Sequence, residues 1–204
     1  HPKHPYTRAL IAAKDIQPRT IGATFGQPLV VATNVVKSFP LKQNFWGKTT
    51  RSFNAVDDVS VTIREGERVG LIGESGSGKS TLGRALIGLT PLSDGQVILA
   101  GVPVEYDQTT SMRQIRRTAQ LVFQDPYSAL NPKIPVGQAI AEVYEHLGME
   151  ARKAADRSIQ LIQEVGLNAE DAERYPGNFS GGQRQRLVIA RALAVEPKFI
   201  VLDE

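Results

Sequence analysis

Short apolar runs bounded by turn residues alternate along the first half of the chain. β-branched residues are frequent in these runs, and Gly, Pro, Ser or Asp residues lie between most of them, which is the pattern of strands separated by turns. Strands are therefore predicted at residues 29–32, 59–63, 67–72, 96–99 and 119–123. The third run enters a glycine-rich turn, after which a helix is predicted at residues 79–89, and a short basic helix is predicted before the last run.

The apolar period changes in the second half of the chain. Ala155, Ile159 and Ile162 recur at the i, i+4 and i+7 positions of one helix face, and Gly166 suits the left-handed residue that ends a helix. Strands resume only near the end of the sequence. This order predicts an α/β fold whose core is interrupted by a helical subdomain at about residues 125–195.

The N-terminal segment differs from the rest in composition. Pro and Gly residues gather between residues 16 and 28 with weak periodicity, which predicts a linker. We expect residues 1–28 to be separate from a domain that spans residues 29–204. The sequence begins at His1 without the pattern of a signal peptide, so we expect it to be cut from a longer protein.

Composition and charge exclude several classes of protein. The chain has 204 residues, 41% hydrophobic and 22% charged, so it is neither collagen-like nor wholly disordered. It has no cysteine for a disulfide or a thiolate zinc site, and its three histidines lack metal-ligand spacing. No apolar run approaches the roughly 18 residues of a membrane-spanning helix. The net charge of +3 lies within residues 1–28, so the neutral remainder argues against a broad nucleic-acid-binding face.

The glycine-rich turn carries a phosphate-binding motif. Residues 73–80 match the spacing G-x-x-x-x-G-K-[ST] between a predicted strand and a predicted helix, as that motif requires. Backbone N–H groups and the positive helix end form an anion cradle, in which Lys79 should reach the β- and γ-phosphates and Ser80 should ligate Mg²⁺. A glycine-rich turn without a ligand is the alternative. The candidate nucleotide-binding residues are Gly73, Glu74, Ser75, Gly76, Ser77, Gly78, Lys79, Ser80 and Thr81.

Two carboxylates follow the last apolar run. Residues 199–202 predict a strand buried on both faces, and Asp203 and Glu204 emerge at its carboxyl end, where ligands bind in open α/β sheets. Asp203 is a candidate for the acid associated with Mg²⁺ through a water molecule. Glu204 is a candidate for the general base that activates the water attacking the γ-phosphate. Two solvated carboxylates in a turn are the alternative.

A second helix start also has the features of a phosphate-binding surface. Ser180 can cap a helix that begins with Gly181 and Gly182 and continues into a long apolar stretch, and the glycines leave backbone N–H groups uncovered. Gln183 completes this segment. One nucleotide cannot readily use both helix starts of one subunit, so the second is predicted to serve a nucleotide on a partner subunit. A glycine-rich helix cap is the alternative.

Together these motifs resemble the ATP-binding cassette (ABC) ATPases. The phosphate loop corresponds to that family's Walker A motif, residues 180–183 to its signature and residues 199–204 to its Walker B motif. The resemblance covers roughly residues 29–204 and implies a P-loop NTPase core of the ABC type that binds and hydrolyses ATP with Mg²⁺. It also implies a head-to-tail dimer with a second ABC ATPase domain, in which the phosphate loop of one domain and the signature of the other enclose each MgATP.

The same resemblance assigns roles to two further residues. Gln124 matches the Q-loop, where it would sense Mg²⁺ or the attacking water and couple the site to the helical subdomain. Phe39 matches the aromatic residue that stacks on adenine after the first strand. Considered alone, Gln124 is an ordinary polar loop residue, and Phe39 is a core or surface side chain.

Two segments resemble one branch of the family, the oligopeptide, dipeptide and nickel importer ATPases: residues 73–83 and the extended Q-loop at residues 123–132. This implies a peripheral subunit on the cytoplasmic face of the inner membrane, with integral membrane permeases and an extracytoplasmic solute-binding protein as partners. The basic insertion at residues 40–51, with Phe45 and Trp46, is expected either to contact the permease or membrane face or to be a solvated hairpin.

Residues 4–10 resemble the tail that follows the cassette in the same branch. We therefore expect a parent protein with two fused cassettes, of which this chain holds the first one's tail, the linker and a second cassette truncated after Walker B. The family's D-loop and switch histidine are then missing. We expect weak nucleotide binding, slow hydrolysis and marginal stability, because the last strand would be an uncovered sheet edge.

Two other functions remain as alternatives to transport. A soluble ABC ATPase acting on nucleic acid or ribosomes is disfavoured by the neutral charge of the main domain, and no nucleic-acid partner is expected. A P-loop kinase for a small molecule would leave residues 180–183 without a role.

Overall fold

The computed structural model describes residues 25–43, 49–106, 109–125 and 129–203. The predicted tail at residues 4–10, the aromatic pair Phe45 and Trp46, and the candidate base Glu204 lie outside the described residues. Among the helices in these ranges, none is long and apolar enough to cross a lipid bilayer.

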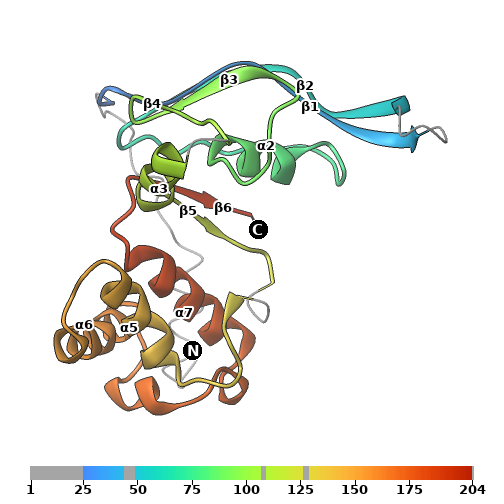
Figure 1. Cartoon of the computed structure of the whole chain (residues 1–204). Coiled ribbons are helices and arrows are strands. Elements are labelled where there is room, and N and C mark those ends of the chain that lie inside the picture. Colours follow the sequence, from blue (N-terminus) through green and yellow to red (C-terminus); the bar gives the residue numbers. More distant parts are fainter. Residues whose placement is uncertain (1–24, 44–48, 107–108, 126–128, 204) are drawn as a thin grey trace, which may run out of the picture.

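An antiparallel sheet forms one layer of the molecule (Figure 1). Its strands are hydrogen-bonded in the order β2-β1-β3-β4, and they comprise β1 (Pro28–Gln43), β2 (Thr49–Arg64), β3 (Asp94–Leu99) and β4 (Val102–Pro103). β1 and β2 form a hairpin whose far end projects beyond the helix beneath it (Figure 1). Both strands are longer than the sequence predicted, because parts of the expected insertion at residues 40–51 continue them.

Helix α2 (Lys79–Leu86) lies under this sheet (Figure 1). Leu82 and Leu86 on its buried face belong to the same hydrophobic core as Val30 of β1 and Leu99 of β3, both of which are fully buried. Burying each such side chain contributes about 1.5–3 kcal/mol. The core therefore fixes the start of α2, and with it the phosphate loop, against the β1–β2 hairpin.

A parallel pair of strands lies beyond α2. The pair consists of β5 (Ala119–Val122), which follows α3 (Thr109–Thr118), and β6 (Phe199–Leu202). The backbone N–H of Asp203 donates to the carbonyl oxygen of Val122 at 3.0 Å, so the pairing continues past the end of β6. A parallel pair needs a long crossover connection, and here that connection is the helical part of the chain.

Two expectations about strands were wrong. Residues 67–72 form no strand, and their apolar side chains are exposed, with 51% of Val69, 52% of Leu71 and 96% of Ile72 accessible. β6 is only partly buried, and Leu202 is 69% exposed. The reason is the same in both cases: within the described residues, β6 pairs only with β5, and residues 67–72 pair with no strand.

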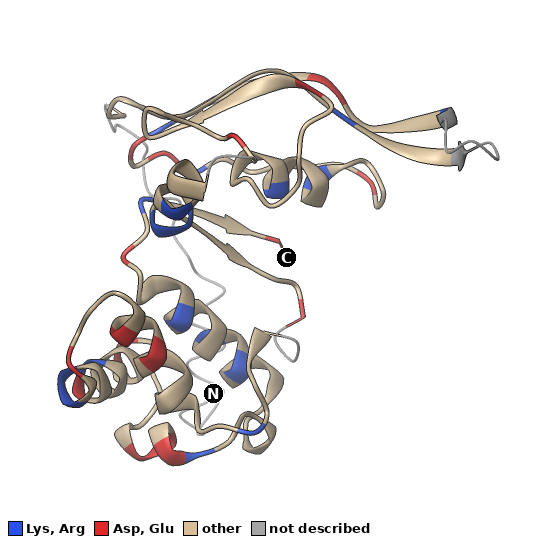
Figure 2. Cartoon of the chain, in the orientation of Figure 1, with Lys and Arg blue, Asp and Glu red and all other residues tan. Residues whose placement is uncertain are grey.

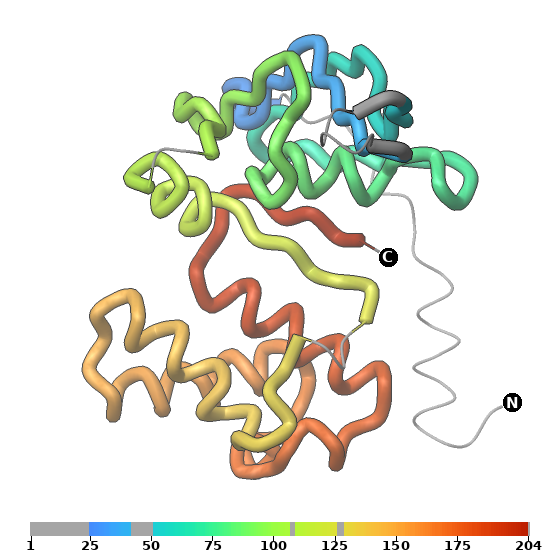
Figure 3. Tube along the Cα trace, turned by 45° about the vertical axis from the view of Figure 1, so that its right-hand side comes forward, coloured from blue at the N-terminus to red at the C-terminus, as the bar shows by residue number. Residues whose placement is uncertain are grey.

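The helical part has a hydrophobic core of its own. The chain enters it after β5 and leaves it through α7, which leads back to β6 (Figure 3). Ile140, Ile162 and Leu187 are fully buried in this core. Gly166 has a φ of 78° just after α6, as the sequence predicted. The elements are α5 (Val136–His146), α6 (Ala151–Glu164), the 3-10 helices η1 (Ala169–Glu173) and η2 (Pro176–Asn178), and α7 (Gly181–Leu193).

Candidate functional site

The phosphate loop turns sharply into α2 at Gly78. This residue is the N-cap of α2 and has a φ of 92°, in the left-handed region that favours glycine. A Cβ atom placed on it would lie 1.9 Å from the carbonyl oxygen of Ala55 on β2. Only glycine fits this close approach, so packing inside the chain explains the last glycine of the motif.

The side chain of Lys79 closes over the loop that precedes it. Its Nζ atom donates hydrogen bonds to the carbonyl oxygens of Gly73 at 2.8 Å and Glu74 at 2.7 Å. A further turn bond joins the N–H of Ser77 to the Glu74 oxygen at 3.2 Å. A positive charge thus lies inside the curl of the loop, next to the N-terminal end of a helix, and both features attract an anion.

Ser80 and Asp203 meet although they are 123 residues apart in sequence. The Ser80 hydroxyl donates to Oδ1 of Asp203 at 2.6 Å. Arg84, one turn further along α2, places Nη2 3.2 Å from the other carboxylate oxygen. The Asp203 side chain is 16% exposed, so it is held on both sides in a largely buried position.

The Ser80 hydroxyl and the Asp203 carboxylate are oxygen donors of the kind that suits a magnesium ion. Mg²⁺ is usually held by one or two protein oxygens together with substrate phosphates and water, and not by a cage of carboxylates. Ser80 and Asp203 supply such oxygens beside the phosphate loop. In the described ranges, no group of three or more His, Cys, Asp or Glu side chains is placed to hold a metal ion.

One cavity of about 1220 Å³ joins most of the predicted nucleotide-binding residues. Phe39 and Gln124, which the sequence places far from the phosphate loop, both line it. Phe53 of β2 also lines it, and Arg84 forms an ion pair with Asp203. Neither residue was identified from the sequence. The predicted site residues on its wall are Phe39, Gly73, Ser75, Gly76, Gly78, Lys79, Ser80, Thr81, Gln124 and Asp203.

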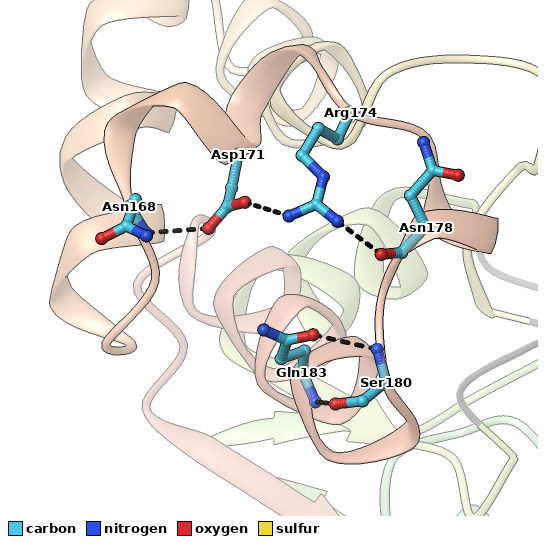
Figure 4. Close-up of polar contacts among 6 residues, drawn as sticks. All are labelled: Asn168, Asp171, Arg174, Asn178, Ser180 and Gln183. Atoms are coloured by element: carbon cyan, nitrogen blue, oxygen red, sulfur yellow. Dashed lines mark hydrogen bonds and ion pairs between the residues drawn. The ribbon is translucent and has the colours of Figure 1, made fainter. Parts of the chain in front are cut away.

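The second helix start lies elsewhere, in the helical part. Among the described residues, none of 180–183 lines the cavity that contains the phosphate loop. Ser180 is the N-cap of α7, and its hydroxyl accepts from the N–H of Gln183 at 3.3 Å, while Oε1 of Gln183 accepts from the N–H of Ser180 at 2.9 Å (Figure 4). This reciprocal capping box fixes the direction in which α7 begins.

The two glycines of this helix start have no internal explanation. A Cβ atom on Gly181 or Gly182 would meet nothing within 4 Å, and neither residue has a positive φ. The chain's own packing and backbone therefore accept a larger residue at both positions. Their small size leaves the helix N-terminus open to a group from outside the chain.

A polar network holds the segment that leads into Ser180. Nη1 of Arg174 lies 2.6 Å from a carboxylate oxygen of Asp171, and Nη2 donates to the carbonyl of Asn178 at 2.6 Å (Figure 4). The Arg174 guanidinium also lies 4.6 Å from the centre of the Phe179 ring. The backbone N–H of Asn168 and the Arg174 guanidinium hold the pKa of Asp171 below its ordinary value.

Comparisons with known proteins are consistent with this geometry. A family model described as ABC transporter matches residues 56–204. The glutathione import ATP-binding protein GsiA of Escherichia coli K12 is 39% identical over 232 residues, and the alignment covers 100% of this chain. The chain spans only 37% of the length of that relative.

Solved structures have the same fold. The ATP-binding cassette MJ0796, in a dimeric post-hydrolysis state bound to ADP and Pi, matches with a TM-score of 0.74 and 29% identity, covering 86% of this chain and 73% of the other. The structure of cbiO1 from Clostridium perfringens, part of the ABC transporter complex cbiONQ, matches with a TM-score of 0.71, covering 87% of this chain and 65% of the other. Its 24% identity supports the fold alone.

Proposed function

We propose that this chain, which belongs to the ABC transporter family, binds and hydrolyses ATP to drive the import of small peptides or similar solutes. The predicted fold class, an α/β P-loop NTPase core of the ABC type, is confirmed by the match to cassette structures. The observation that carries the proposal is the meeting of Lys79, Ser80 and Asp203 at one cavity.

The residues around this cavity divide the chemistry between them. Lys79 exchanges its bonds to the loop carbonyls for the β- and γ-phosphates, whose negative charge pairs with its ammonium group. Ser80 and Asp203 would hold Mg²⁺, which neutralises phosphate charge when it is bound. Gln124 would orient the attacking water and report on the metal, and Glu204 would accept that water's proton. Phe39 would stack on adenine.

The second helix start completes the site of a partner. Ser180, Gly181, Gly182 and Gln183 would face the γ-phosphate bound by a second ABC ATPase domain, in a head-to-tail dimer that a fused parent protein could supply. The open space at both glycines supports this role, because a phosphate oxygen needs unhindered backbone N–H groups. The relative MJ0796 has been described as a dimer.

We propose that the domain spans residues 29–204, with a helical subdomain at about residues 125–195, and that integral membrane permeases contact a groove beside it. This groove of about 680 Å³ is bounded by α3, α5 and α7, and Figure 2 shows basic residues on the first and last of these helices. Its lining combines an exposed aromatic ring with charged and polar side chains: Phe123, Arg116, Glu142, His146 and Arg191. Closure around ATP would move this surface and the permease together.

The transported solute would be chosen by the permease and an extracytoplasmic solute-binding protein. GsiA is named for import of glutathione, a tripeptide, which lies within the proposed class of small peptides. We propose that this chain acts at the cytoplasmic face of the inner membrane as a peripheral subunit.

Substitutions at the two chemical centres test the ATPase proposal. Lys79→Ala should remove ATP binding measured by calorimetry, whereas Lys153→Ala, an exposed lysine on α6, should leave it unchanged. In the complete transporter, Glu204→Gln should retain ATP and stall hydrolysis. Normal turnover by that variant would show that Glu204 is not the base. Co-purification with nucleic acid in place of a permease would favour the soluble alternative.

A further inference from the structure

Two phenylalanines face each other across the β1–β2 hairpin. Phe39 of β1 and Phe53 of β2 are direct Cα partners in the antiparallel register. Residues opposite each other in such a pair project to the same face of the sheet with Cβ atoms about 5 Å apart. Phe39 is 43% exposed and Phe53 is 51% exposed, so neither ring is part of a hydrophobic core.

Both rings belong to the wall of the phosphate-loop cavity. Phe53 lies two residues before Ala55, the residue whose carbonyl oxygen comes so close to Gly78. Ala55 lines the same cavity. The aromatic pair and the part of β2 that contacts the phosphate loop therefore face one cavity.

The Phe39 ring already contacts a cationic side chain. Nζ of Lys37 lies 5.0 Å from the centre of the Phe39 ring, within the range of a cation–π contact. Lys37 is not part of the cavity wall, whereas Phe53 is. Because the two rings are cross-strand partners on this wall, a flat ligand there would contact both, and of the two only Phe39 has a cation–π contact within the described residues.

We propose that Phe53 and Phe39 form a two-ring platform for the nucleobase, and that Phe53 makes the site prefer purine over pyrimidine nucleotides. A purine covers more aromatic surface than a pyrimidine, so it gains more from a second ring. This inference rests on the proposed binding of ATP and extends it to a residue on the opposite strand from Phe39.

Binding of three ligands with Mg²⁺ separates the base from the phosphates: ATP, UTP and inorganic tripolyphosphate, measured by calorimetry on the full chain. Phe53→Ala should weaken ATP binding about tenfold, since stacking of a base on an aromatic ring is worth about 1–3 kcal/mol, a factor of roughly 5 to 150. It should weaken UTP binding less and leave tripolyphosphate binding unchanged. Phe53→Leu keeps apolar bulk without the ring. Its affinity for ATP should lie between those of wild type and Phe53→Ala.

The matched control is Leu41→Ala. Leu41 is 62% exposed on the same hairpin but lies outside the cavity wall, so its removal should not change binding of any of the three ligands. Circular dichroism confirms that each variant folds, and Phe53→Leu remains informative should the alanine variant unfold. If wild type binds ATP and Phe53→Ala binds it equally well, the inference is wrong while the proposed function stands. If wild type binds neither ATP nor tripolyphosphate, the proposed function fails, and the inference with it.

Discussion

The two helix starts of this protein use glycine for opposite reasons. At α2, Gly78 lies against the Ala55 carbonyl with a left-handed backbone, and the helix has no side-chain cap. At α7, Ser180 and Gln183 cap each other, and the glycine at position 182 borders open space. Glycine is required by the fold at the first start, and the fold does not require it at the second.

This difference separates a helix start that faces a cavity of its own chain from one whose proposed ligand comes from a partner. The phosphate loop, Ser80 and Asp203 face one cavity within a single chain. The start of α7 is rigidly held by bonds to its own chain, yet it presents uncovered backbone to the outside. We infer that the first start carries both structure and binding, whereas the glycines of the second serve binding alone.

The largest effect on stability is expected for Gly78→Ala. The new Cβ would overlap the Ala55 oxygen, and a left-handed alanine is strained, so the variant should lose about 3 kcal/mol of unfolding free energy. Urea denaturation of wild type and variant measures the difference. A loss below about 1 kcal/mol would mean that the loop relaxes freely and that Gly78 is not fixed by packing.

Asp171→Asn should have the next largest effect. It removes the charge that binds Arg174 and the N–H of Asn168, and hydrogen bonds to charged groups are worth about 2 kcal/mol. Because folding lowers the pKa of Asp171, its stabilisation is present above the ordinary aspartate pKa of about 3.9 and is lost as the pH falls through the lowered folded-state pKa.

Denaturation curves at several pH values check this sign. The difference in unfolding free energy between wild type and Asp171→Asn should be largest at pH 7 and should shrink below pH 4. Glu164→Gln is the control, since its ion pair with Arg157 joins side chains that are 55% and 33% exposed and should be worth less than about 1 kcal/mol. A difference that grew on acidification would contradict the assigned cause.

Local motifs were predictable from sequence because their chemistry is contiguous. The phosphate loop and the capping box each lie within a few consecutive residues, so spacing alone locates them. Arg84 could have been found by the same reasoning, because it lies one helical turn after Ser80 on the same face of α2. Phe53 could not, since its place opposite Phe39 depends on the register of a long hairpin.

The strand predicted at residues 67–72 shows where sequence reasoning stops. Val69, Leu71 and Ile72 favour a strand, but a strand also needs a neighbour to satisfy its backbone, and none of the described residues supplies one. The same lack of a second neighbour explains why β6 is half-exposed and not buried on both faces. Partner strands are a property of topology, which composition does not encode.

Gln183→Ala sharpens the comparison at the second helix start. The substitution removes the side chain that accepts from the Ser180 N–H and should cost about 1 kcal/mol of stability. The first start has no side-chain cap to remove. Hydrogen exchange of the amides in the first turn of α7 measures the effect, and it should be confined to that turn. Unchanged exchange there would show that the capping box does not hold the helix start.

The smallest effect on stability is expected for Gly182→Ala, and this variant separates structure from function most cleanly. Its Cβ meets nothing within 4 Å, and alanine favours a helix over glycine, so unfolding free energy should change by no more than about 0.5 kcal/mol, toward greater stability. Binding of ATP to its own phosphate loop should also be unchanged. The added methyl group would nevertheless cover the backbone N–H groups offered to a partner's γ-phosphate, so ATP-dependent pairing of the two cassettes of the complete protein, measured by cross-linking across their interface, should be lost. Normal pairing with ATP would mean that these glycines have no role in the interface, because the packing of the described residues does not require them either.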